Sequence, residues 1–96
     1  MRPSEALAKH RAEVRSKIAD FAVADPRIFG STARGEDGEG SDLDIIVRRR
    51  GKLTYLDLAR LEADLSGLLG VKVDVRTEGE FSARIFDRIK RDFVVL

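Results

Sequence analysis

The stretch Ser41-Asp42-Leu43-Asp44-Ile45-Ile46-Val47 places two acidic residues at the start of an apolar, largely β-branched run. The run Leu43–Val47 predicts a central strand of a sheet. Because alternate residues of a strand point to the same face, we expect the carboxylates of Asp42 and Asp44 to project together, roughly 7 Å apart at the backbone. A divalent cation between them would relieve their repulsion, and oxygen ligands suit magnesium or manganese. A lone Asp-x-Asp, however, more often caps a turn and faces water.

A third acidic residue lies on a later segment with strand periodicity. The segment Val71–Arg76 alternates strictly between apolar and polar residues, which predicts a strand with one buried face. Asp74 lies on the polar phase of this strand. If the two strands are neighbours, Asp74 joins Asp42 and Asp44 in a cluster of three carboxylates. Taken alone, Asp74 is equally compatible with an exposed strand position between two basic residues.

A glycine-serine turn precedes these strands. Gly30 ends a short apolar segment, and a glycine there lets the backbone approach a ligand closely. If a helical turn follows, its free N–H groups and the Ser31 hydroxyl would suit a terminal phosphate, with Arg34 adding charge-assisted bonds. The turn by itself is also typical of a plain loop. It is not a P-loop, because Glu36-Asp37 stand where Lys-Ser/Thr are required.

The rest of the chain predicts helices around these strands. Ser4 is a candidate N-cap for a first helix that ends at Asp25-Pro26, and a short strand follows at 27–29. The leucines of Tyr55–Leu69 form one apolar stripe, which predicts a helix ending at Gly70. A last helix is expected around 81–89, and the tail 93–96 is either an edge strand or an interface segment. This order indicates an α/β (α+β) domain spanning 1–96, with a small mixed sheet flanked by helices.

Composition narrows the class of protein. The chain has 96 residues, of which 43% are hydrophobic and 36% charged, and this describes a globular chain. It has no cysteine, no signal-like N-terminus and no apolar run long enough to cross a membrane, so we expect a cytoplasmic protein. The net charge of +1 hides two basic clusters, at 48–52 and 84–91. Each is interpreted as a solvated face or as a contact with a phosphate-rich or acidic partner.

Three segments together resemble the minimal nucleotidyltransferases of the DNA-polymerase-β-like superfamily. They are Gly30-Ser31-Thr32-Ala33-Arg34-Gly35, Ser41-Asp42-Leu43-Asp44-Ile45-Ile46-Val47 and Val73-Asp74-Val75. The family pattern is a Gly-Ser turn, a strand with two acids at alternate positions, and a third acid on a later strand. The resemblance covers nearly the whole chain, because the predicted helices also fall in the family order. The combination is specific, although no single part of it is.

This resemblance implies a polymerase-β-like fold and magnesium-dependent chemistry on ATP. Asp42 and Asp44 would hold two Mg²⁺ ions on the triphosphate, and Asp74 would complete the metal site and help to deprotonate the attacking hydroxyl. The residues that hold the phosphates would be Gly30, Ser31 and Arg34. Attack on the α-phosphorus would transfer a nucleoside monophosphate and release pyrophosphate. All motif positions are intact, which predicts a competent nucleotidyltransferase.

The resemblance also suggests a biological role. Proteins of this kind are typically the antitoxin of a two-gene toxin–antitoxin pair whose toxin is a ribonuclease with a HEPN domain. In that family the antitoxin transfers AMP from ATP to a tyrosine of the toxin and silences it. No separate acceptor-binding domain is evident in 96 residues, so we expect the acceptor to come from this partner, in a hetero-oligomer.

Three alternatives remain beside this hypothesis. The chain could modify a small-molecule acceptor, as antibiotic-modifying nucleotidyltransferases do, although it lacks an acceptor domain. It could also neutralise a toxin by binding alone, without catalysis. Direct nucleic-acid binding through Arg48–Lys52 ranks last, because it leaves the three acidic residues unexplained.

Overall fold

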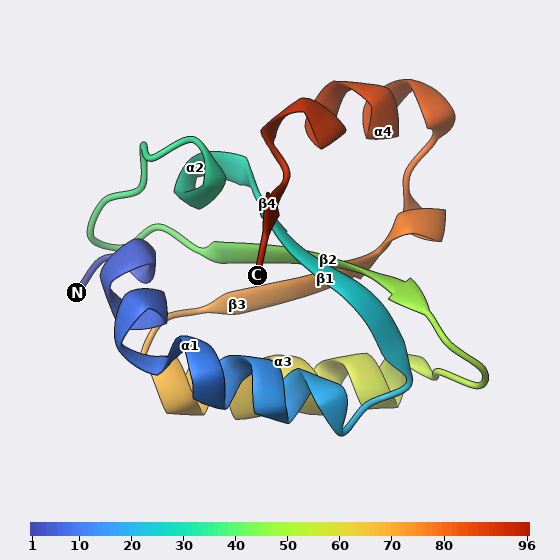
Figure 1. Cartoon of the computed structure of the whole chain (residues 1–96), viewed down its shortest axis with the longest axis horizontal. Helices are drawn as coiled ribbons and strands as arrows, with labels where there is room; N and C mark the ends of the chain where they lie inside the picture. Colours follow the sequence, from blue (N-terminus) through green and yellow to red (C-terminus); the bar gives the residue numbers. More distant parts are fainter.

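The computed structural model describes all residues from 1 to 96, and it consists of one four-stranded sheet with helices on both faces (Figure 1). In chain order the longer elements are α1 (Pro3–Ala19), β1 (Val23–Phe29), α2 (Gly30–Ala33), β2 (Leu43–Arg49), α3 (Tyr55–Leu69), β3 (Val73–Thr77), α4 (Ala83–Ile89) and β4 (Val94–Val95). Two short 3-10 turns, η1 (Glu78–Glu80) and η2 (Lys90–Asp92), flank α4. None of the helices combines the length and apolar composition needed to span a lipid bilayer.

The sheet is mixed, as the order of predicted elements indicates. Its strand order is β3-β2-β1-β4, with β2 and β3 parallel and the other two pairs antiparallel. The parallel pair is connected by α3, which crosses one face of the sheet beside α1, while α2 and α4 lie on the other face (Figure 1). The predicted α+β class with helices around a small mixed sheet is confirmed.

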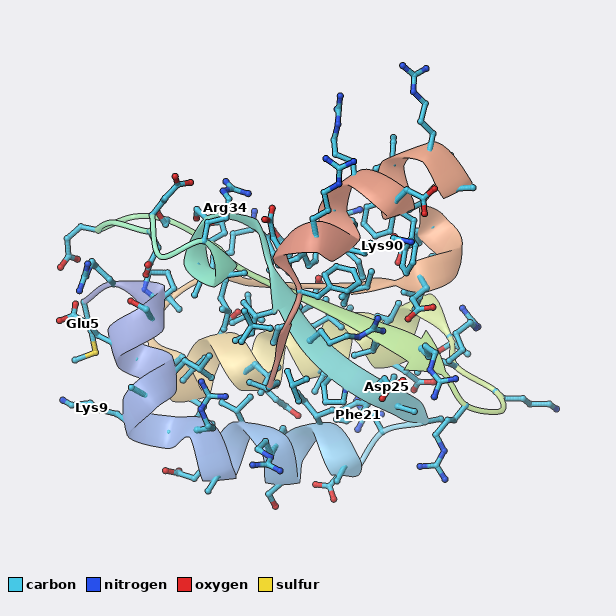
Figure 2. All side chains as sticks on the ribbon, turned by 45° about the horizontal axis from the view of Figure 1, so that its top comes forward. Glu5, Lys9, Phe21, Asp25, Arg34 and Lys90 are labelled. Carbon is cyan, nitrogen blue, oxygen red and sulfur yellow. The ribbon has the colours of Figure 1, made fainter.

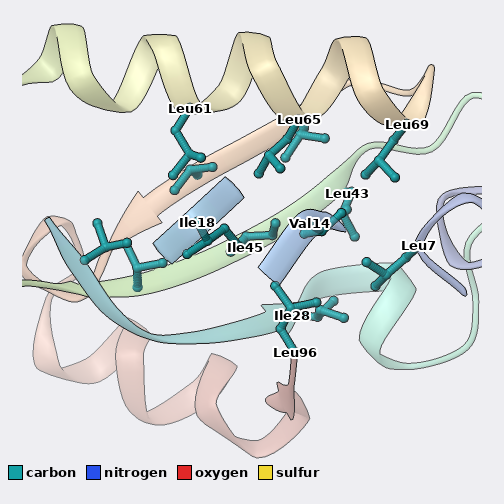
Figure 3. Close-up of a cluster of buried hydrophobic side chains, with 14 of the residues drawn as sticks. Leu7, Val14, Ile18, Ile28, Leu43, Ile45, Leu61, Leu65, Leu69 and Leu96 are labelled. Atoms are coloured by element: carbon teal, nitrogen blue, oxygen red, sulfur yellow. The ribbon is translucent and has the colours of Figure 1, made fainter. Parts of the chain in front are cut away.

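The hydrophobic core lies between the sheet and the pair α1 and α3 (Figure 3). The predicted leucine stripe of α3 supplies Leu58, Leu61, Leu65 and Leu69, all buried. The helix ends at Gly70 in the left-handed conformation (φ +71°), as expected for a glycine that stops a helix. The full cluster also includes residues of α1, three strands, the β2–α3 connection and the buried C-terminal residue: Ala6, Leu7, Val14, Ile18, Val23, Ile28, Leu43, Ile45, Val47, Leu53, Val73, Val75 and Leu96.

Strand β1 begins earlier than the sequence predicted. The first helix does not run to Asp25-Pro26 but ends at Ala19, and β1 starts at Val23. Pro26 lies inside the strand because the pairing register with β2 shifts between Ala24 and Arg27. Asp25 has a positive φ of 53° at this irregularity. A bulge tolerates a proline that has no N–H for the ladder, and the sequence pattern does not reveal it.

The start of α1 is stabilised from a distant loop. The predicted N-cap at Ser4 is wrong, since the N-cap is Arg2 and Pro3 is the first helical residue, where the missing N–H has no cost. The free N–H of Ser4 donates instead to Asp37 Oδ2 at 2.8 Å. Asp37 is 6% exposed, so the loop between α2 and β2 is tied to the N-terminus of α1 by a buried carboxylate.

The free edge of β3 is closed by side chains of its own chain. Ser66 Oγ accepts from the Val73 N–H at 3.0 Å, and Glu62 Oε2 accepts from the Val75 N–H at 2.7 Å. Glu80 Oε2 accepts from the Thr77 N–H at 2.7 Å. These three groups occupy the donors that another strand would need for pairing at this edge. At the opposite edge, the tail whose role the sequence left open forms the short strand β4, which pairs with β1.

Candidate active site

The three acidic residues lie at the same end of the parallel strand pair. Asp44 of β2 lies directly opposite Asp74 of β3 in the register, so the two side chains share a face of the sheet. Asp42 precedes β2 by one residue, and its carboxylate affects the ionisation of Asp44. The strands are thus neighbours, as the expected cluster required, and their paired acids lie on the face opposite the main core.

Burial and crowding make the charge of Asp44 unfavourable. Desolvation raises the pKa of Asp44, and the nearby carboxylates of Asp74 and Asp42 raise it further. Arg76 and Lys72 act in the opposite direction. A divalent cation would relieve this crowding, so the chemistry of these donors fits a hard, oxygen-preferring ion.

The side chains are not arranged as a finished metal site. No three Asp, Glu, His or Cys side chains of the chain are gathered closely enough to hold an ion as they stand. Asp42 Oδ2 lies 3.7 Å from Lys72 Nζ, which partly neutralises it. Joint coordination by the three acids therefore requires their side chains to rotate toward one another.

The glycine-serine turn lies at the same end of the sheet. Phe29, the last residue of β1, is paired with Asp44, and α2 begins at the next residue, Gly30. Gly30 has a φ of +75°, and a β-carbon there would lie 2.5 Å from Asp44 Oδ2. Only glycine allows the turn and this carboxylate to approach so closely. A helical turn does follow, because α2 begins at Gly30 itself, and the structure brings its start against the central acid.

Arg34 has other partners in this structure. It caps the C-terminus of α2, and its Nε lies 2.7 Å from Glu36 Oε1. Its Nη1 lies 3.4 Å from Asp92 Oδ2 in η2. The hydrogen bond with Glu36 raises the pKa of Arg34; partial desolvation opposes this effect and Asp92 assists it. The side chain thus links the turn to η2 instead of contacting the three acids.

Two basic residues belong to this site that sequence reasoning did not include. Lys72 and Arg76 lie two residues before and two residues after Asp74, and both favour the ionised form of Asp44. The strict alternation of Val71–Arg76 carried this signal, because it placed all three polar residues on one face. The site therefore combines carboxylates for a cation with cations suited to an anionic ligand.

A small aromatic cluster supports the site face. Phe29 of β1 packs edge-to-face on Phe81 and Phe93, at centroid distances of 6.0 and 6.4 Å. Phe93 contacts Phe86 of α4 at 5.7 Å and lies under the Arg27 guanidinium at 4.9 Å. Arg27 also pairs with Glu78. This cluster holds α4 and η2 over the sheet beside the acids, a packing that residue periodicity did not predict.

Comparison with known families agrees with this geometry. The family model described as "Nucleotidyltransferase domain" matches residues 7–96, which include every residue of the site. The chain belongs to the nucleotidyltransferase domain family. It is accordingly an enzyme of the transferase class, with the minimal nucleotidyltransferase fold.

Relatives of this nucleotidyltransferase include protein-modifying enzymes. A protein from Methanocaldococcus jannaschii, provisionally named a protein adenylyltransferase, is 43% identical over 86 residues, covering 85% of this chain and 92% of its own. The protein adenylyltransferase MntA of Thermococcus cleftensis is 34% identical over 88 residues, covering 92% and 86%. A known structure provisionally described as a minimal nucleotidyltransferase superposes with a TM-score of 0.86 at 41% identity, covering 97% of this chain and 95% of the other.

The fold also occurs in a toxin–antitoxin complex. A chain of the MntA–HpeT toxin–antitoxin structure with a Y104A mutation matches with a TM-score of 0.74 at 20% identity, covering 90% of this nucleotidyltransferase and 70% of that chain. At this identity the likeness concerns the fold alone.

Proposed function

We propose that this chain is the antitoxin of a toxin–antitoxin pair and transfers AMP from ATP to a tyrosine of a HEPN-domain ribonuclease toxin. The observation that carries the proposal is the register of Asp44 opposite Asp74, with the Gly30-Ser31 turn packed against Asp44. A relative named as the protein adenylyltransferase MntA supports a protein acceptor. The fold shared with an MntA–HpeT complex supports a separate toxin as partner.

Magnesium would be held by the three acids. Asp42, Asp44 and Asp74 supply only oxygen donors, and the raised pKa of Asp44 reflects a site in which added positive charge is favourable. When bound, two Mg²⁺ ions would supply Lewis-acid activation of the attacking oxygen and stabilisation of the leaving one.

The residues of the chain would bind and orient the two substrates. The backbone of Gly30 and the Ser31 hydroxyl would hold the terminal phosphates, close to Asp44. The tyrosine oxygen would bond to the α-phosphorus while the bond from that phosphorus to the bridging oxygen of the β-phosphate breaks. Pyrophosphate would leave, and the phenolic proton would pass to Asp74, which lies on the edge strand β3.

Arg34 would have to exchange partners to assist. Its guanidinium is bound to Glu36 and Asp92, and both ion pairs are largely exposed. Exposed pairs of this kind contribute little to stability because water screens them, so a triphosphate at the turn could replace them. In this proposal Arg34 turns from η2 toward the phosphates when ATP binds.

Incubation with Mg²⁺, labelled ATP and the protein encoded by the neighbouring gene, as the candidate toxin, tests the proposal. Label on that protein with wild type, and none with Asp42→Ala/Asp44→Ala, is the expected result. Mass spectrometry of the acceptor then identifies the modified side chain. Tyr55 is the only tyrosine of the chain and is exposed, so Tyr55→Phe separates self-labelling from transfer to the partner.

The same experiment separates the proposal from its alternatives. Neutralisation of the toxin by Asp42→Ala/Asp44→Ala, with no label from any nucleoside triphosphate, would contradict catalysis and favour inhibition by binding. Transfer to aminoglycoside-type small molecules but not to the toxin would contradict the protein acceptor. Label on an amino acid other than tyrosine would contradict only the assigned acceptor residue.

A further inference from the structure

Three arginines of the α4–η2 segment form a ridge that has no partner within the chain. Arg84, Arg88 and Arg91 are spaced by four and three residues, which places them on one side of a helical segment. All three are exposed, and none takes part in an ion pair, whereas the neighbouring Lys90 pairs with Asp87 at 3.0 Å. Figure 2 shows long nitrogen-tipped side chains projecting from α4 away from the sheet. We call these three residues the arginine ridge.

The ridge is fixed in place beside the candidate active site. Phe86, on the inner side of α4, packs on Phe93, which in turn packs on Phe29 of β1. Asp92, next to Arg91, pairs with Arg34 at the end of α2 at 3.4 Å. The helix is therefore anchored to the sheet by aromatic contacts, and before ATP binds its end is also linked to the turn proposed to bind phosphate.

The composition of the surface around the ridge favours a protein as its occupant. Ile85 is 47% exposed between the arginines. A shallow hollow of about 360 Å³ is lined by Ser82, Arg84, Ile85 and Arg88. An apolar side chain surrounded by arginines is typical of protein interfaces, where arginine is enriched. Single-stranded nucleic acids usually stack on exposed aromatic rings, and the rings of this region pack on one another instead.

We infer that the arginine ridge is the docking surface for an acidic patch on the acceptor protein, and this inference rests on the proposed function. Guanidinium groups bind carboxylates through paired hydrogen bonds, and a row of them matches acidic side chains on a partner. Their field would also guide the partner toward the adjacent acids before contact is made. The ridge would thus position the acceptor on this small chain.

The test compares association of the toxin with two triple variants of equal charge. R84Q/R88Q/R91Q removes the ridge, and K9Q/R15Q/R50Q removes three exposed, unpaired charges from α1 and from the residue that follows β2. At low salt we expect the ridge variant to associate about tenfold more slowly, with a smaller change in dissociation, while the control stays near wild type. The difference should shrink in roughly 0.5 M salt, because exposed charges are then screened.

Three results would overturn the inference. Equal loss in both variants would mean that net charge alone matters, and no loss in either would mean that the ridge is not in the interface. Selective loss of binding to a 20-nucleotide single-stranded RNA, with toxin association intact, would assign the ridge to nucleic acid.

The outcome is separable from that of the proposed function, because association needs no chemistry. Ridge-dependent binding of the toxin without any transfer of label would contradict the proposed function and leave the docking surface supported. Transfer of label, together with association that does not depend on the ridge, would support the proposed function and contradict the docking surface. A wild-type chain that does not bind the toxin at all would contradict both.

Discussion

Asp44 occupies the space that a side chain at Gly30 would need, since its Oδ2 lies 2.5 Å from the position of a β-carbon on that residue. The contact joins the central acid of β2 to the first residue of α2, two segments that approach because β1 and β2 are paired at Phe29 and Asp44. The absence of a side chain at residue 30 is therefore a requirement of the site as well as of the turn.

Gly30→Ala is expected to disrupt the site and the turn together. The left-handed conformation costs a non-glycine residue roughly 1–2 kcal/mol, and the new methyl group would also displace the Asp44 carboxylate. Gly35→Ala is the matched control, because Gly35 has a similar φ of +72° but nothing within 4 Å of its β-carbon position. We expect comparable losses of unfolding free energy but loss of transfer only in Gly30→Ala. Retained transfer in Gly30→Ala would show that Asp44 is free to move.

Asp44→Asn should abolish transfer without destabilising the fold. Loss of a carboxylate that is proposed to bind Mg²⁺ is expected to lower the transfer rate by roughly 100-fold or more. Because burial and the two neighbouring acids raise the pKa of Asp44 in the folded chain, ionisation of Asp44 destabilises the native state. The variant should therefore be at least as stable as wild type at pH 7.

The pH dependence of that comparison has a defined sign. As pH rises above the ordinary carboxyl pKa of 3.8, the unfolded chain releases the Asp44 proton first, so wild type loses stability relative to Asp44→Asn until the raised folded pKa is passed. Denaturant unfolding from pH 3 to 7 measures this difference, with Asp64→Asn as a surface control. A stability deficit in Asp44→Asn at neutral pH would indicate a structural role for the carboxylate.

Asp37→Asn should behave in the opposite way. Burial raises the pKa of Asp37, but its hydrogen bonds with Ser4 outweigh this and lower the pKa overall. The ionised carboxylate thus stabilises the native state above the unfolded pKa, and this contribution is lost as pH falls through the lowered folded pKa. We expect Asp37→Asn to lose about 1 kcal/mol at pH 7 and to approach wild type in acid. Glu39→Gln, which removes an exposed charge nearby, should change stability by less than about 0.5 kcal/mol.

Glu62→Ala is expected to open the free edge of β3. The Val75 N–H would lose its acceptor, which costs about 1 kcal/mol, and the edge would become available for strand pairing. Light scattering at increasing protein concentration should reveal self-association of this variant. Asp64→Ala removes a carboxylate from the same helix that only pairs with Lys17 at 3.9 Å, and it should remain like wild type. Equal self-association of both variants would mean that charge, not the edge, is responsible.

Magnesium should stabilise the wild-type chain through the three acids. Binding to the native state alone raises the unfolding free energy by about 2.7 kcal/mol when the free ligand is 100 times its Kd. We expect Mg²⁺ with a non-hydrolysable ATP analogue to raise the Tm of wild type but not that of Asp42→Ala/Asp44→Ala. An equal rise in both proteins would place the ion elsewhere.

The sequence predicted those features that rest on local periodicity. Alternation in Val71–Arg76 indicated a half-buried strand with Asp74 on its polar side, and the β-branched run after Asp42 indicated the central strand. The structure adds that these strands are adjacent and parallel, which brings Asp44 opposite Asp74. Resemblance to a family, more than periodicity, supplied the assignment of chemistry.

Features that depend on distant contacts were beyond prediction from local patterns. Arg34 pairs with Asp92, 58 residues away, and the N–H of Ser4 is bound by Asp37, 33 residues away. The early start of β1 depends on a bulge that accommodates Pro26 within a paired strand. In each case the deciding interaction joins elements whose relative position follows only from the complete fold.

The division of the sheet into a packed face and a charged face has a consequence for evolvability. The main core lies on the side of α1 and α3, while the three acids, α2 and the arginine ridge belong to the other side. Under the proposed docking role of the arginine ridge, substitutions that redirect the enzyme to a new acceptor would accumulate on α4 without disturbing the leucines that stabilise the domain. In a deep mutational scan, substitutions that lower abundance should map to the core side of the sheet, and substitutions that lower only activity should map to the charged side. The scaffold can then be inherited while its specificity diversifies.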